Sequence, residues 1–184
     1  MIFEPGVFCE KKDERGYWFL FKKDKVLYFG KDDDIRFPEL ISPSELGLKT
    51  TEPQFIGTID GRNAFTAQVF DTEEIYYNCC GVAQYTYASL RDLYTAIGRQ
   101  MFTIVGRALH ICRWHESWKF CPSCGAPMED SKTERAKVCT KYGRSLNLQQ
   151  TIQPYLSYFP LYRQLYCTYC KDFAVFPHLP KHTI

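Results

Sequence analysis

Two β-prone runs flank an Asp60-Gly61 pair in the segment Gln54-Phe-Ile-Gly-Thr-Ile-Asp-Gly-Arg-Asn-Ala-Phe-Thr-Ala-Gln-Val-Phe70. Asp-Gly between such runs is among the strongest signals for a tight β-hairpin. A second hairpin is predicted upstream, where the aromatic-rich runs 16–21 and 25–30 flank a short polar turn. Residues 35–49, with two prolines and a glycine, are predicted as a loop. The front of the chain is therefore expected to form an antiparallel sheet of four or more strands.

The pattern changes to that of a helix over residues 89–117. Ser89 is a candidate N-cap, with Asp92 close to capping-box spacing. Gly98 is expected to mark a kink or a break. After it, apolar side chains recur at i, i+3, i+4 and i+7, which predicts a long helix packed under the sheet. His110 and His115 lie off a common face of such a helix, which disfavours a metal-binding role for them.

Composition excludes several classes of protein. The 184 residues are 45% hydrophobic and 24% charged, as in globular rather than disordered or fibrous chains. The net charge of +2 supports neither a dedicated nucleic-acid surface nor a membrane surface. No apolar run approaches the roughly 20 residues that cross a bilayer, and the N-terminus lacks the pattern of a signal peptide. A cytoplasmic protein without membrane contact is expected, and in that compartment the nine cysteines favour metal ligation over disulfides.

Cys121-Pro-Ser-Cys124-Gly125 is the sharpest chemical signal in the chain. Two cysteines separated by two residues can direct both sulfurs at one tetrahedral ion. Cys139 follows after a segment long enough for a β-hairpin that returns to the metal. Cys121, Cys124 and Cys139 are therefore the candidate ligands of a structural zinc ion in a small zinc ribbon.

The fourth zinc ligand is the open question at this site. A second knuckle would need cysteine at position 142, but Tyr142 stands there, followed by Gly143. A neutral phenol is a poor zinc ligand, since its pKa is about 10. Three structural alternatives remain: rescue by Cys167 or Cys170, a weakened site of three thiolates, or no bound metal. A catalytic zinc with an open position is disfavoured, because no acidic base stands at a suitable spacing.

Three features together resemble the NADH pyrophosphatases, the Nudix hydrolases that carry a zinc ribbon. They are the hairpin at 57–62, the helix through 106–115, and the knuckle at 120–127 with Cys139 downstream. The resemblance implies a non-catalytic N-terminal Nudix-like domain that leads through the ribbon into a catalytic Nudix domain. It also implies hydrolysis of the pyrophosphate of NAD(H), to NMN(H) and AMP, and of NAD caps on RNA. Magnesium or manganese as cofactor and a homodimer are further implications of the family.

The chain departs from this family at the catalytic motif. The Nudix signature G-x5-E-x7-R-E-x-x-E-E-x-G holds divalent cations that act on the pyrophosphate. Here the last glutamate is Glu134 and the last glycine is Gly143, so no signature follows the ribbon. No catalytic residue, no cofactor-binding residue and no magnesium or manganese site is therefore expected. NAD(H) or NAD-capped RNA is expected as a ligand only if a catalytic domain is supplied.

The segment after the ribbon differs in composition from the rest. Residues 145–184 contain five tyrosines and only four charged residues, Arg163, Lys171, Asp172 and Lys181. Two explanations remain open: a divergent tail, or a reading frame lost near residue 143 that leaves a truncated protein. The expected organisation is an α+β Nudix-like domain over 1–117, an incomplete ribbon over 118–143 and an irregular tail over 144–184.

Three functions are compatible with these observations. The first is the N-terminal and ribbon part of an NAD(H) diphosphatase, inactive by itself. The second is a non-enzymatic ribbon that binds protein or RNA, and the third is a dimerisation partner for an intact paralogue. The second would use the basic residues of the ribbon, although a solvated face explains them more simply: Lys132, Arg135, Lys137, Lys141 and Arg144.

Overall fold

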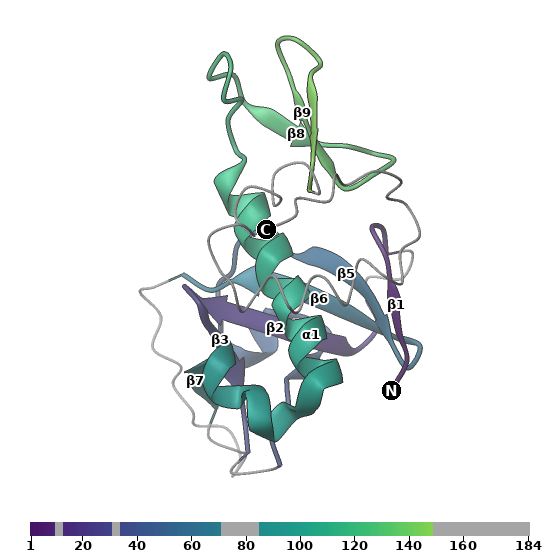
Figure 1. The fold of residues 1–184 in the computed structure, drawn as a ribbon, viewed down its shortest axis with the longest axis vertical. Coiled ribbons are helices and arrows are strands. Elements are labelled where there is room, and N and C mark those ends of the chain that lie inside the picture. The colour runs from purple at the N-terminus through teal and green to yellow at the C-terminus, as the bar shows by residue number, and fades with distance from the viewer. Residues whose placement is uncertain (10–12, 31–33, 71–84, 149–184) are drawn as a thin grey trace, which may run out of the picture.

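The computed structural model describes residues 1–9, 13–30, 34–70 and 85–148, and it has an α+β architecture (Figure 1). A large sheet is covered by one long helix, and a small second sheet lies beyond the end of that helix. In the large sheet the strands are β1 (Phe3–Pro5), β2 (Gly16–Lys22), β3 (Lys25–Tyr28), β4 (Glu39–Leu40), β5 (Gln54–Ile59), β6 (Arg62–Gln68) and β7 (Thr86–Ser89). The other elements are the 3-10 helix η1 (Pro43–Leu46), the helix α1 (Leu90–Ser117) and the small-sheet strands β8 (Met128–Asp130), β9 (Ala136–Cys139) and β10 (Ser145–Asn147).

Both predicted hairpins are present, and the expected α+β fold with a long packing helix is confirmed. Strand β2 pairs with β3, and β5 pairs with β6, each antiparallel. The sheet order is β1-β5-β6-β2-β3-β7, with β4 added beside β2. One pair differs from the expectation of an antiparallel sheet: β2 and β6 run parallel. The two hairpins dock side by side through these strands, so the sheet is mixed.

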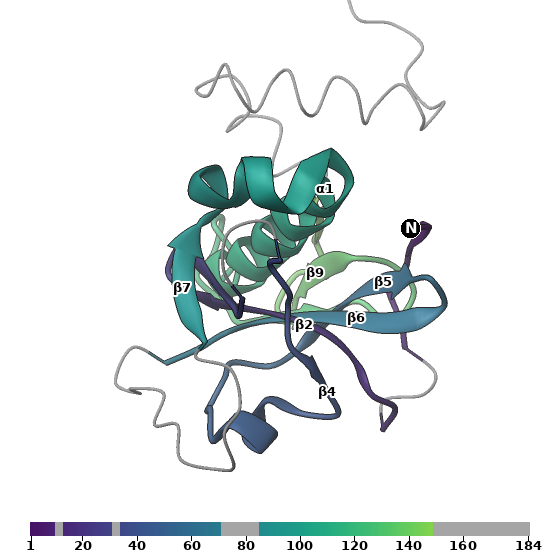
Figure 2. The same cartoon turned by 90° about the horizontal axis from the view of Figure 1, so that it is seen from below.

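Strand β2 is buried on both faces, which explains its unbroken apolar sequence. Phe19 and Phe21 point into the core beneath α1. Trp18 and Leu20 point to the opposite face, into a second cluster with Leu48. Figure 2 shows α1 on one side of the sheet and the β4 segment on the other. A central strand covered on both faces reads as a continuous hydrophobic run.

Helix α1 follows the predicted boundaries and the predicted kink. Ser89 caps it, since its hydroxyl oxygen accepts a hydrogen bond from the backbone N–H of Asp92. Gly98 breaks the helical path with φ 70° and ψ 164°. Beyond the kink the buried stripe of α1 covers the sheet. No helix in the described part of the chain is both long enough and apolar enough to cross a bilayer.

Two segments have more structure than the sequence patterns predicted. The expected loop at 35–49 contains β4 and the short helix η1, which starts at a capping box formed by Ser42 and Glu45. The small sheet extends past residue 143, because β10 pairs with β9. Leu146 of β10 packs against the cysteine cluster of the ribbon. The rest of the tail, with Cys167 and Cys170, lies outside the described residues.

Candidate metal centre

The first knuckle begins shortly after α1 ends. Phe120 and Pro127 form a bridge that closes the segment between them into a loop. Inside it the N–H of Cys121 donates to the carbonyl of Ala126, and the N–H of Gly125 donates to the carbonyl of Cys121, both at 2.8 Å. Gly125 has φ 70°, which only glycine adopts without steric cost. The sequence Cys-Pro-Ser-Cys-Gly therefore forms the tight turn that its spacing predicts.

The second knuckle repeats this backbone pattern around a missing thiol. The N–H of Gly143 donates to the carbonyl of Cys139 at 2.8 Å, and the N–H of Cys139 donates to the carbonyl of Arg144 at 2.9 Å. Gly143 has φ 65°, close to the value at Gly125. Position 142 thus corresponds to Cys124 of the first knuckle. Tyr142 is 68% exposed, and the ammonium of Lys141 lies over its ring at 5.2 Å.

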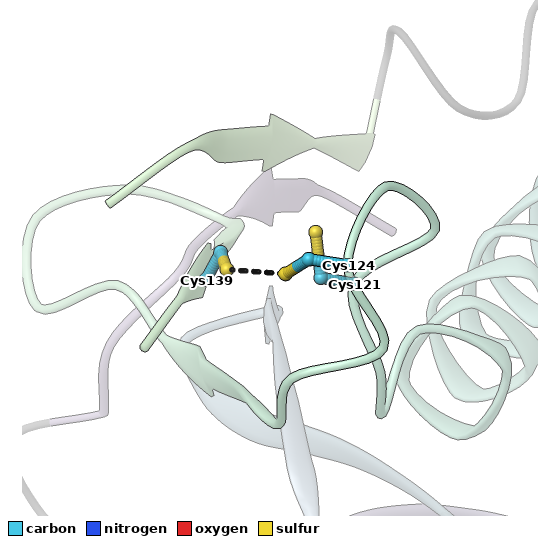
Figure 3. Close-up of side chains that lie close together, drawn as sticks. All are labelled: Cys121, Cys124 and Cys139. Carbon is cyan, nitrogen blue, oxygen red and sulfur yellow. Dashed lines mark hydrogen bonds between the residues drawn. The ribbon is translucent and has the colours of Figure 1, made fainter. Parts of the chain in front are cut away.

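The three predicted cysteines come together between these knuckles (Figure 3). Their sulfur atoms all lie within 4.8 Å of one another, and the Cys124 and Cys139 sulfurs are 3.6 Å apart. Sulfurs that share a tetrahedral zinc ion at ~2.3 Å stand about 3.8 Å apart, so the spacing fits one ion. Cys121 and Cys139 are buried, and Met128 packs beside them. The cysteine cluster, defined as Cys121, Cys124 and Cys139, could hold a metal ion.

The pKa values of the Cys121 and Cys124 thiols are shifted in opposite directions. The backbone N–H groups of Ser123 and Cys124, together with hydrogen bonds from the neighbouring thiols, lower the pKa of Cys121 to about 7. The N–H of Ala126 acts in the same direction on Cys124, but burial and the sulfurs of Cys139 and Cys121 outweigh it and raise the pKa of Cys124. Cys121 therefore ionises before Cys124. A metal ion that binds here displaces protons, which makes its affinity dependent on pH.

Arg135 connects the ribbon to the front domain, the N-terminal part of the chain that contains the large sheet and α1. It follows β8 on the ribbon hairpin, and its Nη2 donates to the backbone carbonyl of Gly6 at 2.7 Å and to that of Phe55. Burial lowers the pKa of Arg135 to about 10, so the guanidinium remains charged at neutral pH. A single half-buried cation thus connects the ribbon to β5 and to the residue that follows β1.

A family model described as the NADH pyrophosphatase-like rudimentary NUDIX domain matches residues 15–114, more than half of the chain. The chain belongs to this family. Its matched region runs from the strand β2 to the last turn of α1, so it ends just before the ribbon.

Curated relatives match a shorter stretch. The NAD-capped RNA hydrolases NudC of Salmonella paratyphi B, Salmonella newport and Salmonella heidelberg are each 42% identical to the chain over 40 residues. That stretch is 22% of this chain and only 16% of each relative. The expected kinship with NADH pyrophosphatases is confirmed at the level of this NUDIX-like domain.

The two histidines of α1, His110 and His115, lie in different surroundings. Burial, and secondarily the charge of Arg113, lowers the pKa of His110 to about 4. Among the described residues, His110 joins no group of metal-ligating side chains, whereas His115 lies with Glu52 and Asp130. No local pattern could have found this second group, because its members come from segments far apart in the chain.

The basic residues of the ribbon do not form one solvated face. Lys137 is 5% exposed and its Nζ lies 2.8 Å from Oδ1 of Asp130. Arg135 is committed to the carbonyls of the front domain. Arg144 donates to the Ser123 hydroxyl on the first knuckle. Of the five, Lys132, Lys141 and Arg144 are exposed.

Proposed function

We propose that these 184 residues act as the non-catalytic front module of an NAD(H)-diphosphatase-type protein, with a ribbon that binds structural zinc. The observation that carries the proposal is the continuity of the parts. A rudimentary NUDIX domain runs through α1 directly into a docked ribbon with three converging thiols. The similarity to NAD-capped RNA hydrolases supports the same class of protein.

Zinc is the metal that best suits the cysteine cluster. Thiolate ligands select soft or borderline ions, and a tetrahedral sulfur site in a small hairpin favours zinc. The three sulfurs supply three of the four positions. The side chain of Tyr142 is mostly exposed and is not proposed as the fourth ligand. A water molecule is then the simplest ligand for the fourth position.

The same residues are proposed to lack pyrophosphatase activity of their own. Pyrophosphate hydrolysis needs cations held by clustered glutamates. The sequence contains no such signature, because no glutamate follows Glu134 and no Arg-Glu pair stands at the required spacing before Glu73-Glu74. Hydrolysis would need a catalytic domain in addition to these residues. We also propose that the chain forms a dimer, either with a second copy of itself or with a complete relative, and a complete relative would supply that domain.

Incubation of the purified chain with NADH or NAD-capped RNA, in magnesium or manganese, tests this function. We expect no release of NMNH, AMP or decapped RNA, while a complete NudC in the same buffer gives all of them. Zinc analysis of the same sample is expected to give bound zinc that chelation removes. Turnover by the chain that rises with enzyme concentration and survives further purification would contradict the proposal.

The second candidate function, an RNA-binding module, is tested by measuring RNA binding at several salt concentrations. A nucleic-acid module would bind RNA with an affinity that falls steeply with salt, because phosphate contacts release counterions. The inward position of Arg135 and Lys137 argues against such a surface. We therefore expect no RNA binding even at low ionic strength, where phosphate contacts are strongest.

A further inference from the structure

Three donor groups meet where α1, the front domain and the ribbon converge. His115 lies in the last turn of α1, Glu52 precedes β5, and Asp130 ends β8. Nε2 of His115 is 3.8 Å from Oε2 of Glu52, and its Nδ1 is 3.7 Å from Oδ2 of Asp130. One ligand atom from each residue can be chosen so that all lie within 4.8 Å. This histidine–carboxylate cluster is separate from the cysteine cluster.

One ring nitrogen of the histidine in this cluster lacks a hydrogen-bond partner. His115 is only 7% exposed, and its Nδ1 is buried without a hydrogen-bond partner. A buried polar atom left unpaired costs about 1–3 kcal/mol. Glu52 and Asp130 also line a cavity of about 610 Å³, which gives a small ligand a route to the site. The arrangement thus combines a nitrogen donor, two carboxylates and access from solvent.

We propose that His115, Asp130 and Glu52 bind a divalent transition-metal ion, and that this ion connects the ribbon to the front domain. One imidazole and two carboxylates form a donor set that suits zinc. Ligand atoms around zinc at ~2.0–2.2 Å stand about 3.4 Å apart, so the cluster has to contract slightly. Nδ1 and Asp130 already face each other. The side chain of Glu52 is 73% exposed and can turn onto the ion.

The charges around the cluster permit this ion. Lys137 pairs with Oδ1 of Asp130 at 2.8 Å, which leaves Oδ2 for the metal. Burial first, and then the charge of Lys137, lowers the pKa of His115 against the opposing effect of Asp130, Glu52 and Glu116. The imidazole is therefore neutral near pH 7, which is the form that binds metals. Two carboxylates compensate the charge of a divalent cation beside the lysine.

Cobalt titration of the full chain tests the site, because cobalt reports thiolate ligands separately. The cysteine cluster gives a near-ultraviolet charge-transfer band, whereas the histidine–carboxylate cluster adds bound cobalt without that band. We expect His115→Gln to bind one equivalent fewer than the wild type in equilibrium dialysis, with the charge-transfer band unchanged. A double variant, Cys121→Ser with Cys139→Ser, is expected to lose the band and keep the other equivalent.

Asp130→Asn and Glu129→Gln form a matched pair of variants on β8. Successive strand residues face opposite sides, so the exposed Glu129 points away from the cluster. We expect Asp130→Asn to lose the same equivalent as His115→Gln, and Glu129→Gln to retain it. Circular dichroism of each variant checks the fold. Equal binding by folded Asp130→Asn and wild type, or an equal loss in both β8 variants, would overturn the proposal, and neither result depends on NADH hydrolysis.

Discussion

Tyr142 stands on a backbone that is already shaped for a metal ligand. The hydrogen bonds of its knuckle match those around Cys124, and the glycine that follows has the same positive φ. Tyr142→Cys is therefore expected to complete a four-thiolate site without refolding. We expect the affinity for zinc to rise by about tenfold or more, which corresponds to at least ~1.4 kcal/mol. Competition with a chromophoric chelator measures the change.

Two cysteine variants serve as controls for that experiment. Cys121→Ser removes a buried ligand and is expected to lower zinc content and the melting temperature. Cys9→Ser changes a half-buried thiol outside the cysteine cluster and is expected to alter neither. Zinc binding that is equal in Cys121→Ser and wild type would contradict the ligand assignment.

His110 makes stability depend on acidity. Burial lowers its pKa from 6.5 to about 4, so below pH 6.5 the unfolded chain binds a proton that the folded chain resists. Stability is therefore complete above about pH 6.5 and is lost as the pH falls toward about 4, with a total near 3 kcal/mol. Urea unfolding at a series of pH values measures this slope.

The variant His110→Gln isolates that contribution from other groups. Glutamine has no charge to gain, so we expect a shallower fall of stability between about pH 6.5 and 4. His115, whose pKa is also lowered, contributes in the same direction and remains in the variant. An unchanged pH profile in His110→Gln would show that the buried imidazole is not the source.

At the scale of the element, the kink in α1 depends on one residue. Gly98 has φ 70° and ψ 164°, a region that is almost restricted to glycine, and an added Cβ would meet no atom within 4 Å. The cost of Gly98→Ala is therefore conformational, and we expect about 1–3 kcal/mol of destabilisation. Thermal or urea unfolding measures it.

Gly106→Ala is the matched control on the same helix. Gly106 has helical geometry, and an added Cβ would meet Leu90 at 3.6 Å, an ordinary contact. We expect this change to be neutral or to stabilise by up to ~1 kcal/mol, because alanine favours helices. Similar destabilisation by both substitutions would argue against strain at the kink.

The elements that could be predicted from sequence are those with local signals. The Asp60-Gly61 turn, the Ser89 cap and the two C-x-x-x-Gly turns each depend on residues within a few positions of one another. The approach of Cys139 to the first knuckle also followed from spacing. The short helix η1 had a local signal too, because Ser42 and Glu45 stand at capping-box spacing.

The remainder depends on contacts between distant segments. Nothing near β2 indicates that it pairs parallel to β6, since that choice is made by the docking of two hairpins. The meeting of Glu52, His115 and Asp130 has the same origin. Arg135 looked like a surface cation by type, but its position on the ribbon places it against backbone carbonyls of the front domain.

At the scale of the whole molecule, Arg135 determines how firmly the ribbon is held. A hydrogen bond from a charged group to a buried acceptor contributes about 1.5–3 kcal/mol. Arg135→Ala removes two of them and is expected to destabilise the chain by roughly 2–4 kcal/mol. Hydrogen exchange is expected to rise in β8 and β9 more than in β2.

Lys132→Ala is the control for this change on the same hairpin. Its side chain is exposed, and surface substitutions of this kind shift stability by less than about 0.5 kcal/mol. We expect its exchange pattern to match that of the wild type. A loosened ribbon in Lys132→Ala would mean that general charge, rather than the Arg135 contacts, holds the two parts together.

The parallel pair at the centre of the sheet has a consequence for how the chain reaches its structure. Hairpin partners such as Phe21 and Val26 are near neighbours, whereas Tyr17 of β2 faces Ala64 of β6. The chain between Tyr17 and Ala64 forms a long loop, and closing it costs conformational entropy before the strand contacts form. Pairings between segments far apart in the sequence therefore slow folding. Each hairpin can therefore form early and alone, while the rate of folding is governed by the later encounter between them. Substitutions in the paired residues of β2 and β6 are then expected to slow refolding. Substitutions in the ribbon are expected chiefly to increase the rate at which the ribbon unfolds.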